Sequence, residues 1–320
     1  MPDLPTELSG LQLGTLNSAK RMARSFHDIT GVDFGFAYAA GQMTERTSVR
    51  FHTRNKKPLT DLPPEQRLPE TINGMEVDVL ASGYMLHDSN PRTARDMLQP
   101  GISIGNVNTQ TTGTLGALVQ DPATQQIFIL SNWHVLCGAP EAAVGDSISQ
   151  PGPFDLGSNP ARPVGQLERW IRLSEQYDAA LALVLPEMNM TQELFNSTLK
   201  ITGVAAPALG QTATKSGAVS GVTHALIDGI AGSYRLDYTA YGDGPEWMAG
   251  FHLVEDPKSP SKALSLEGDS GSLWVDSTGQ NAIGLHFAGE DAVSPLNQYA
   301  LAHPLADVLE RLAVTLAKLS

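Results

Sequence analysis

The chain has 320 residues, 41% of them hydrophobic and 17% charged, a composition typical of a globular protein with room for two domains. Its 34 acidic residues against 21 lysines and arginines give a formal net charge of −13, which argues against nucleic acid as a partner. No stretch has the roughly 18 uninterrupted apolar residues of a membrane helix, and the start lacks the features of a signal peptide. The single cysteine, Cys137, excludes an internal disulfide, so we expect a cytoplasmic protein with no membrane partner.

The first part of the chain is predicted to form a small α+β domain over residues 1–95. Apolar residues at helical spacing predict a helix within 12–27. Strands are predicted at Phe34–Ala39, Thr47–Thr53 and Met75–Leu80, the second with alternating polarity. No catalytic residue types cluster here, so a regulatory or recognition role is expected.

Beyond residue 100 the pattern changes to short strands separated by glycine and turn residues, which is typical of β-barrels. We expect one domain over 96–320, with a first barrel at about 101–185 and a second at about 200–303. The linker between them is predicted near 186–199. Apolar residues at helical spacing over 304–319 predict an amphipathic C-terminal helix that packs across a barrel.

The stretch Gly268–Ser272 has the sequence Gly-Asp-Ser-Gly-Ser, which suits a serine nucleophile but also occurs in ordinary turns. Flanking glycines would let the N–H groups of Gly268 and Ser270 turn inward and form an oxyanion hole. Upstream, His134 follows a predicted strand, and Asp178 enters an apolar strand where a carboxylate needs a partner. Acyl transfer by a serine requires such a base and such an orienting acid.

The sequence around each of these residues resembles trypsin-like (chymotrypsin-fold) serine proteases, over residues 101–305. Three segments resemble the histidine, aspartate and nucleophile motifs of bacterial members, and a fourth resembles part of their second barrel: Ser131–Val135, Tyr177–Leu181, Gly268–Ser272 and Lys215–Gly221. The resemblance implies a mainly β fold, a chymotrypsin-like double β-barrel with a small N-terminal α+β domain and a C-terminal helix. It also implies a serine endopeptidase with His134 as general base, Asp178 as its orienter and Ser270 as nucleophile. The resemblance also places these three residues in a cleft between two perpendicular six-stranded barrels.

The N-terminal region resembles a domain of intracellular bacterial trypsin-like proteins related to plant Narrow Leaf 1, through the segments Arg54–Leu59, Leu62–Glu65 and Gly74–Asp78. Activated trypsin-like zymogens pair a new N-terminus with the acid before the nucleophile, here Asp269. No Ile-Val-Gly-Gly start precedes the first barrel, so Asp269 needs another partner and the site is either formed constitutively or completed on binding. We expect the activity to be gated by the N-terminal domain, by an activating partner or homo-oligomer, or by the 255–262 loop.

The specificity pocket is expected beside the strand at Gly284–Gly289. The resemblance implies that this strand pairs with the substrate backbone and forms one wall of the pocket, which extends to Gly289. His286 resembles the pocket histidine of glutamyl endopeptidase and of picornaviral cysteine proteases, which accept Glu or Gln. Leu264 occupies the position where trypsin has an aspartate, which argues against a preference for Lys or Arg before the cut bond. Ser265 is expected to line the same pocket. The alternative is that His286 faces a neighbouring strand and the pocket takes small apolar residues.

The histidines outside the motifs have no metal-ligand spacing, so neither a metal nor another cofactor is expected. Cys137 is predicted to be a small buried hydrophobe rather than a redox switch. The expected partner is a protein or peptide substrate. The competing hypothesis is a catalytically silent protease-like module that binds peptides or scaffolds an assembly.

Overall fold

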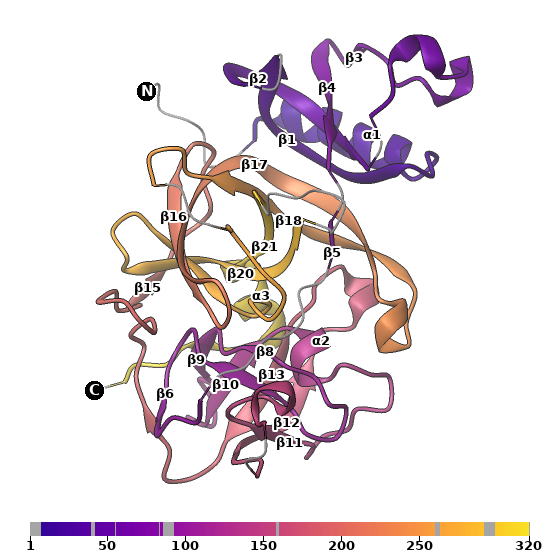
Figure 1. Ribbon diagram of the computed structural model, residues 1–320. Helices are drawn as coiled ribbons and strands as arrows, with labels where there is room; N and C mark the ends of the chain where they lie inside the picture. The colour runs from indigo at the N-terminus through magenta and orange to yellow at the C-terminus, as the bar shows by residue number, and fades with distance from the viewer. Residues whose placement is uncertain are drawn as a thin grey trace.

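The computed structural model describes residues 8–39, 42–54, 56–82, 84–85, 93–157, 160–259, 263–290 and 298–319. Within these ranges the protein is mainly β, with two large sheets, one two-stranded sheet and few helices (Figure 1). No helix in the described ranges is long and apolar enough to cross a membrane. The mainly β fold class predicted from the turn-rich pattern is confirmed.

The first large sheet corresponds to the predicted first barrel. Its strand order is β22-β9-β10-β13-β12-β11-β7-β8. The strands are β7 (Ser103–Asn106), β8 (Gly113–Thr114), β9 (Ala117–Gln120), β10 (Ile127–Ser131), β11 (Ser147–Ser149), β12 (Pro163–Trp170), β13 (Ala180–Val184) and β22 (Thr315–Leu316). Leu118, Ile129 and Leu167 lie fully buried in one core cluster. His134 was predicted to follow a strand, and β10 does continue almost directly into the short helix α2 (Trp133–Leu136), which was not predicted.

The second large sheet contains the predicted second barrel. Its strands are β15 (Gly203–Val204), β16 (Thr212–Gly217), β17 (Gly221–Asp237), β18 (Pro245–Glu255), β19 (Leu273–Asp276), β20 (Asn281–Glu290) and β21 (Tyr299–Pro304). β17 and β18, of 17 and 11 residues, form a long hairpin that Figure 1 shows in orange, reaching past the barrel on the right. The length of this hairpin lets its middle pair with β1 while its tip contacts Trp133 of the first barrel.

The N-terminal unit comprises α1 (Gly10–Ala23), β1 (Ile29–Ala39), β2 (Gln42–Thr53), β3 (Thr71–Ile72), β4 (Met75–Ala81) and β5 (Tyr84–Met85). α1 begins with a capping box in which Ser9 and Gln12 bond to each other's backbone N–H groups. β1 pairs antiparallel with β17, for example Gly31 with Tyr234. The N-terminal strands, indigo and purple in Figure 1, therefore extend the sheet of the second barrel.

A buried ion cluster, made of Asp33, Arg50, Asp228 and His252, joins the N-terminal strands to the β17–β18 hairpin. The Arg50 guanidinium donates to both carboxylate oxygens of Asp33 at 2.6 and 2.7 Å, and to Asp228 at 3.0 Å. Asp228 also contacts His252 Nδ1 at 2.6 Å. Burial would lower the pKa of Arg50, but the two carboxylates outweigh it and hold that pKa well above its ordinary value. The N-terminal unit is thus held by charged contacts as well as by strand pairing.

The remaining elements are a two-stranded sheet and several 3₁₀ turns. The two-stranded sheet pairs β6 (Met97–Leu98) with β14 (Asn189–Met190), which lies in the predicted linker. The 3₁₀ turns are η1 (Leu59–Asp61), η2 (Pro64–Gln66), η3 (Pro153–Asp155), η4 (Leu173–Glu175) and η5 (Thr239–Tyr241). Of these, η5 forms the tip of the β17–β18 hairpin.

The prediction of a C-terminal helix over 304–319 is wrong in its second half. Helix α3 covers only Leu305–Leu312, with its apolar face buried. Ala313 has φ +53°, a left-handed conformation that ends the helix. Thr315 and Leu316 then pair with β9, because the sheet edge offers backbone partners that a continued helix would leave unused.

Candidate active site

His134 and Asp178 lie together at the end of two paired strands. β10 and β13 are antiparallel neighbours, with Ser131 opposite Ala180, so residues just beyond these positions meet. His134 Nδ1 is 2.5 Å from Asp178 Oδ2, and the His134 backbone N–H donates to Asp178 Oδ1 at 3.1 Å. The local sequence therefore places the predicted base and its predicted orienter in direct contact.

The Asp178 carboxylate is fully buried but has further partners. The Tyr238 hydroxyl donates to Oδ2 at 2.8 Å. Burial would raise the pKa of Asp178, but His134, His303 and the Tyr238 hydroxyl outweigh it and hold that pKa below its ordinary value. The backbone is fixed too, because Asp178 N–H donates to His303 Nε2 at 3.0 Å and Asn132 Nδ2 donates to the Asp178 carbonyl at 2.7 Å. The carboxylate is therefore ionised and rigidly oriented at neutral pH.

Sequence reasoning missed the contributions of Tyr238 and His303. Tyr238 stands 60 residues after Asp178, at the far end of β17, and no motif surrounds it. No sequence motif surrounds His303 either, but it accepts the Asp178 N–H and its Nδ1 lies 2.5 Å from the Ala249 carbonyl. Only the fold reveals these contacts.

Replacing His303 with glutamine is expected to weaken the acid sensitivity of folding. Burial lowers the pKa of His303 to about 4, below its ordinary value of 6.5, so the unfolded chain binds the proton more tightly. The stabilisation by neutral His303 is complete above pH 6.5 and is lost as pH falls towards 4, by about 2 kcal/mol between pH 7 and 5. Urea unfolding at both pH values should show this difference shrinking in His303→Gln. The exposed His27→Gln variant should keep the wild-type difference, and an equal loss in all three proteins would contradict the assignment.

The loop that carries Ser270 is fastened to the first barrel. Gly268 has φ +94°, a conformation that other residues rarely adopt. Its carbonyl accepts from Thr114 Oγ1 at 2.7 Å, and the Ser270 carbonyl accepts from the Thr114 N–H at 2.8 Å. The Gly268 N–H donates to no acceptor among the described residues, as an oxyanion donor requires. The loop conformation suits the predicted oxyanion hole of Gly268 and Ser270.

Gly113, in β8, marks the point where the Ser270 loop and the His134 helix meet. A Cβ atom at this position would lie 2.4 Å from Val135 Cγ2 and 2.8 Å from the Ser270 carbonyl oxygen. Val135 directly follows His134, so the two chain segments pack against the same glycine. His134 Nε2 is buried and has no hydrogen-bond partner within the described residues. The structure thus gathers the predicted nucleophile, base and orienter at one junction between the barrels.

Asp269 finds its partner in a buried lysine. Lys215 Nζ donates to Asp269 Oδ2 at 2.8 Å, and both side chains are completely buried. The other oxygen of Asp269 accepts the N–H groups of Val219 and Ser220 at 2.9 and 3.0 Å. Burial would raise the pKa of Asp269, but Lys215 and Ser220 hold it far below its ordinary value. An internal lysine therefore supplies the charge that a new N-terminus supplies in activated zymogens.

The predicted specificity residues lie next to the Ser270 loop. The His286 carbonyl accepts from Gly271 N–H at 2.9 Å, which joins β20 to the loop. His286 Nε2 lies 2.7 Å from Ser265 Oγ, so these two predicted pocket residues contact each other. Both are fully buried, as is Leu264. The structure brings these three residues together beside the nucleophile loop.

Gly289, the last predicted pocket residue, has a different neighbour. It pairs with Met85 of β5, and Glu290 pairs with Tyr84. The N-terminal unit therefore contributes a short strand to the edge of β20. This is the strand that the sequence predicted to pair with a substrate backbone.

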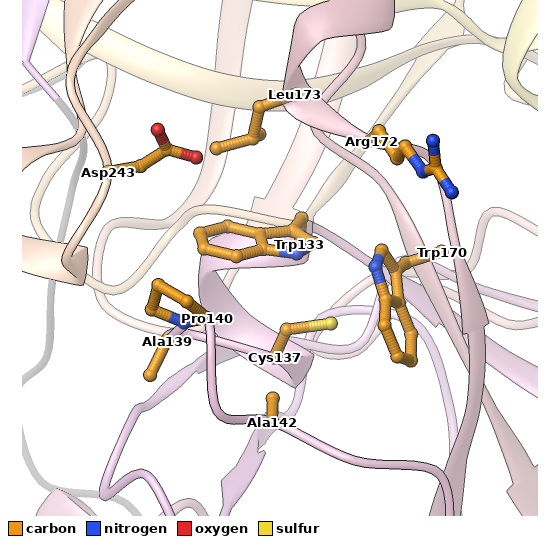
Figure 2. A pocket seen from close by; sticks show the side chains of 9 residues that line it. All are labelled: Trp133, Cys137, Ala139, Pro140, Ala142, Trp170, Arg172, Leu173 and Asp243. Carbon is orange, nitrogen blue, oxygen red and sulfur yellow. The ribbon is translucent and has the colours of Figure 1, made fainter.

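A pocket of about 160 Å³ lies beside the short helix that carries His134. Figure 2 shows the Trp133 indole at its centre, with Leu173 and Cys137 on different sides of the ring. The other lining residues are Ala139, Pro140, Ala142, Trp170, Arg172 and Asp243. Burial raises the pKa of the Cys137 thiol, so the thiol stays protonated, and the prediction of a small buried hydrophobe is confirmed. The described ranges contain no group of three or more side chains suited to hold a metal ion.

A scan against protein-family models and a search of curated proteins found no match for the chain. Solved structures do match. One is a glutamic acid specific serine protease that uses a histidine triad in substrate binding, with 20% identity, a TM-score of 0.50, and coverage of 69% of this chain and 100% of that one. Nocardiopsis protease and Cellulomonas bogoriensis chymotrypsin each show 15% identity and a TM-score of 0.50, covering 69% and 70% of this chain and all of theirs. At these identities the likeness establishes the architecture, and the chain has the chymotrypsin-like double β-barrel fold of these serine proteases.

Proposed function

We propose that this protein is a cytoplasmic serine endopeptidase, with His134, Asp178 and Ser270 as its catalytic triad. The contact between His134 Nδ1 and Asp178, at the junction where the Ser270 loop is fastened, carries the proposal. The shared fold of the serine protease neighbours supports it. The N-terminal segments support a relation to bacterial trypsin-like proteins of the Narrow Leaf 1 type.

In the proposed mechanism, Ser270 Oγ attacks the carbonyl carbon of the scissile peptide bond while His134 Nε2 takes its proton. Asp178 holds the Nδ1 proton, which leaves Nε2 as the acceptor. The N–H groups of Gly268 and Ser270 stabilise the negative charge on the carbonyl oxygen. His134 then gives its proton to the departing amine, and water, activated by the same imidazole, releases the acyl group from Ser270.

Cleavage of a peptide library tests the proposal directly. The purified protein is expected to cut internal peptide bonds, and prior treatment with a fluorophosphonate should remove the cutting because it esterifies an activated serine. Cutting that survives complete treatment would contradict a serine mechanism. A chelator such as EDTA, as a matched control, should leave the cutting unchanged.

The proposed preference is for Glu or Gln before the cut bond, read by His286. The support is its contact with Ser265 and its place beside the Ser270 loop. An imidazole can donate to a carboxylate or a carboxamide. The library should therefore be enriched in cuts after Glu or Gln, and His286→Leu should remove the enrichment. Cuts mainly after small apolar residues would favour the alternative pocket.

The N-terminal unit is the proposed gate, and its support is the pairing of β5 with Gly289 and Glu290. A substrate backbone that pairs with this edge of β20 would have to displace β5. Insertion of a specific protease site within 86–92 and cleavage there should release β5 and speed up library cutting. An unchanged rate would leave an activating partner, a homo-oligomer or the 255–262 loop, of which 260–262 lie outside the described residues.

The second candidate function, a silent binding module, is favoured by one observation. The N-terminal unit carries a cavity of about 670 Å³, far from any triad residue in sequence. Phe26, Ile29, Leu68 and Val77 line it together with Lys56. A mixed apolar and charged cavity of this size suits ligand recognition. Labelling of the protein by a fluorophosphonate would reject a silent module, while recognition by the N-terminal unit would remain compatible with catalysis.

A further inference from the structure

The Tyr238 hydroxyl is aimed at the oxygen of Asp178 that faces the imidazole. Tyr238 is fully buried, and its hydroxyl donates to Asp178 Oδ2 at 2.8 Å. The same oxygen lies 2.5 Å from His134 Nδ1. Hydrogen bonds to an ionised carboxylate are among the strongest in proteins. Tyr238 and His134 therefore share one carboxylate oxygen, and the tyrosine limits how that oxygen can move.

The hairpin tip also packs around the imidazole ring. The Tyr238 ring meets His134 edge-on, with centroids 6.4 Å apart, and makes a similar contact with Trp133 at 6.4 Å. Tyr241, in η5, lies 5.5 Å from the His134 ring. Aromatic pairs at these separations and angles are attractive. The tip of the β17–β18 hairpin thus orients both members of the His134–Asp178 pair.

The position of Tyr238 is fixed by β17, whose last residue, Asp237, directly precedes it. β17 pairs antiparallel with β1 over Gly229–Tyr234. Arg50 links Asp33 of β1 to Asp228 of β17. The N-terminal strands therefore hold β17 in register through backbone pairing and buried charges. The Tyr238 hydroxyl, which directly follows this firmly held strand, is therefore preorganised to donate to Asp178.

We infer that Tyr238 is a positioning residue of the active site, which holds the Asp178 carboxylate and through it the His134 imidazole. The inference rests on the proposed function, because it assigns the proton-transfer role to His134. Several groups face the pair: Tyr238 and Tyr241 from the hairpin and His303 from β21. Four tyrosine hydroxyls in the described ranges donate to a carboxylate, those of Tyr38, Tyr177, Tyr234 and Tyr238, and of these Tyr238 donates to Asp178.

The test is the Tyr238→Phe variant, measured by the rate of fluorophosphonate labelling across pH. Loss of the hydroxyl should slow labelling at neutral pH by roughly tenfold to a hundredfold. The acidic limb of the profile should move to higher pH, because Asp178 Oδ2 then has the imidazole as its main donor and favours the imidazolium. A labelling rate within twofold of the wild type with an unmoved acidic limb would overturn the inference.

Tyr234→Phe is the matched control, because it also removes one buried hydroxyl that donates to a buried carboxylate, here Asp33, and leaves the backbone pairing of β17 in place. It should lower the thermal unfolding temperature as much as Tyr238→Phe does, but leave the labelling rate and its acidic limb unchanged. Equal slowing in both variants would reduce Tyr238 to a structural role and overturn the inference.

Nuclear magnetic resonance separates this inference from the proposed function. Titration of the His134 ring nitrogens in ¹⁵N-histidine-labelled protein needs no turnover. The midpoint should rise in Tyr238→Phe and stay in place in Tyr234→Phe. Absent labelling of the wild type would contradict the proposed function, while an unmoved midpoint in Tyr238→Phe would contradict the positioning role.

Discussion

Replacing Lys215 with methionine is expected to lower the free energy of unfolding by about 3–5 kcal/mol at pH 7. The variant keeps a side chain of similar length but leaves the Asp269 carboxylate without its cation. Both side chains are completely buried in the wild type, so water does not screen the loss. Chemical denaturation measures the change. The penalty should shrink as pH falls, because protonation neutralises the unpaired carboxyl.

The same variant should lose fluorophosphonate labelling. Asp269 directly precedes Ser270, and its backbone N–H donates to the Leu266 carbonyl at 3.0 Å within the loop. Once the ion pair is gone, the loop can relax away from the geometry that presents Gly268 and Ser270. The double variant Lys215→Met, Asp269→Asn should recover part of the lost stability, because no charge is then buried alone. The exposed Lys200→Met variant should match the wild type. Full stability in Lys215→Met would contradict a structural role for the pair.

Asp178→Asn is expected to reduce kcat/KM by about 10⁴-fold. The asparagine amide can present an N–H to His134 Nδ1, which drives the imidazole proton to Nε2. A protonated Nε2 cannot accept the proton of Ser270. Initial rates on a peptide that the library has identified measure the loss, and unfolding curves show whether the fold persists.

Asp307→Asn is the matched control for this change. Asp307 also accepts a tyrosine hydroxyl, from Tyr177 at 2.8 Å, whereas the His134 imidazole contacts Asp178. Its replacement should leave kcat/KM within a factor of two. Comparable losses in both variants would mean that the effect comes from packing around the carboxylates and not from the imidazole tautomer.

The sequence predicted those features that depend on neighbouring residues. Ser131–Val135 lies at the end of a strand, and the Gly-rich stretch at 268–272 forms a tight loop, both as expected. The strands around Phe34, Thr47 and Met75 were also predicted, the second from its alternation of apolar and polar residues, which is a local signal. The resemblance of short segments to trypsin-like proteases implied the double barrel, and the same segments supplied the three candidate catalytic residues.

Contacts between residues far apart in the chain could not be predicted from the sequence. The partner of Asp269 is 54 residues away, and Tyr238 is 60 residues from Asp178. The union of β1 with β17 joins residues about 200 positions apart, with no motif to signal it. The C-terminal helix was predicted too long for a related reason: Leu316 fits the helical spacing, but it pairs with Val119 at the edge of β9.

Fluorophosphonate labelling of the purified protein, followed by peptide mapping, shows directly whether Ser270 is the nucleophile. A single adduct is expected on Ser270 and none in Ser270→Ala, with both proteins unfolding at the same temperature. Labelling of the Ser270→Ala protein at the wild-type level, or an adduct on another residue, would contradict the proposed triad. Absence of any adduct on a folded protein from which β5 has been released would contradict a working serine nucleophile.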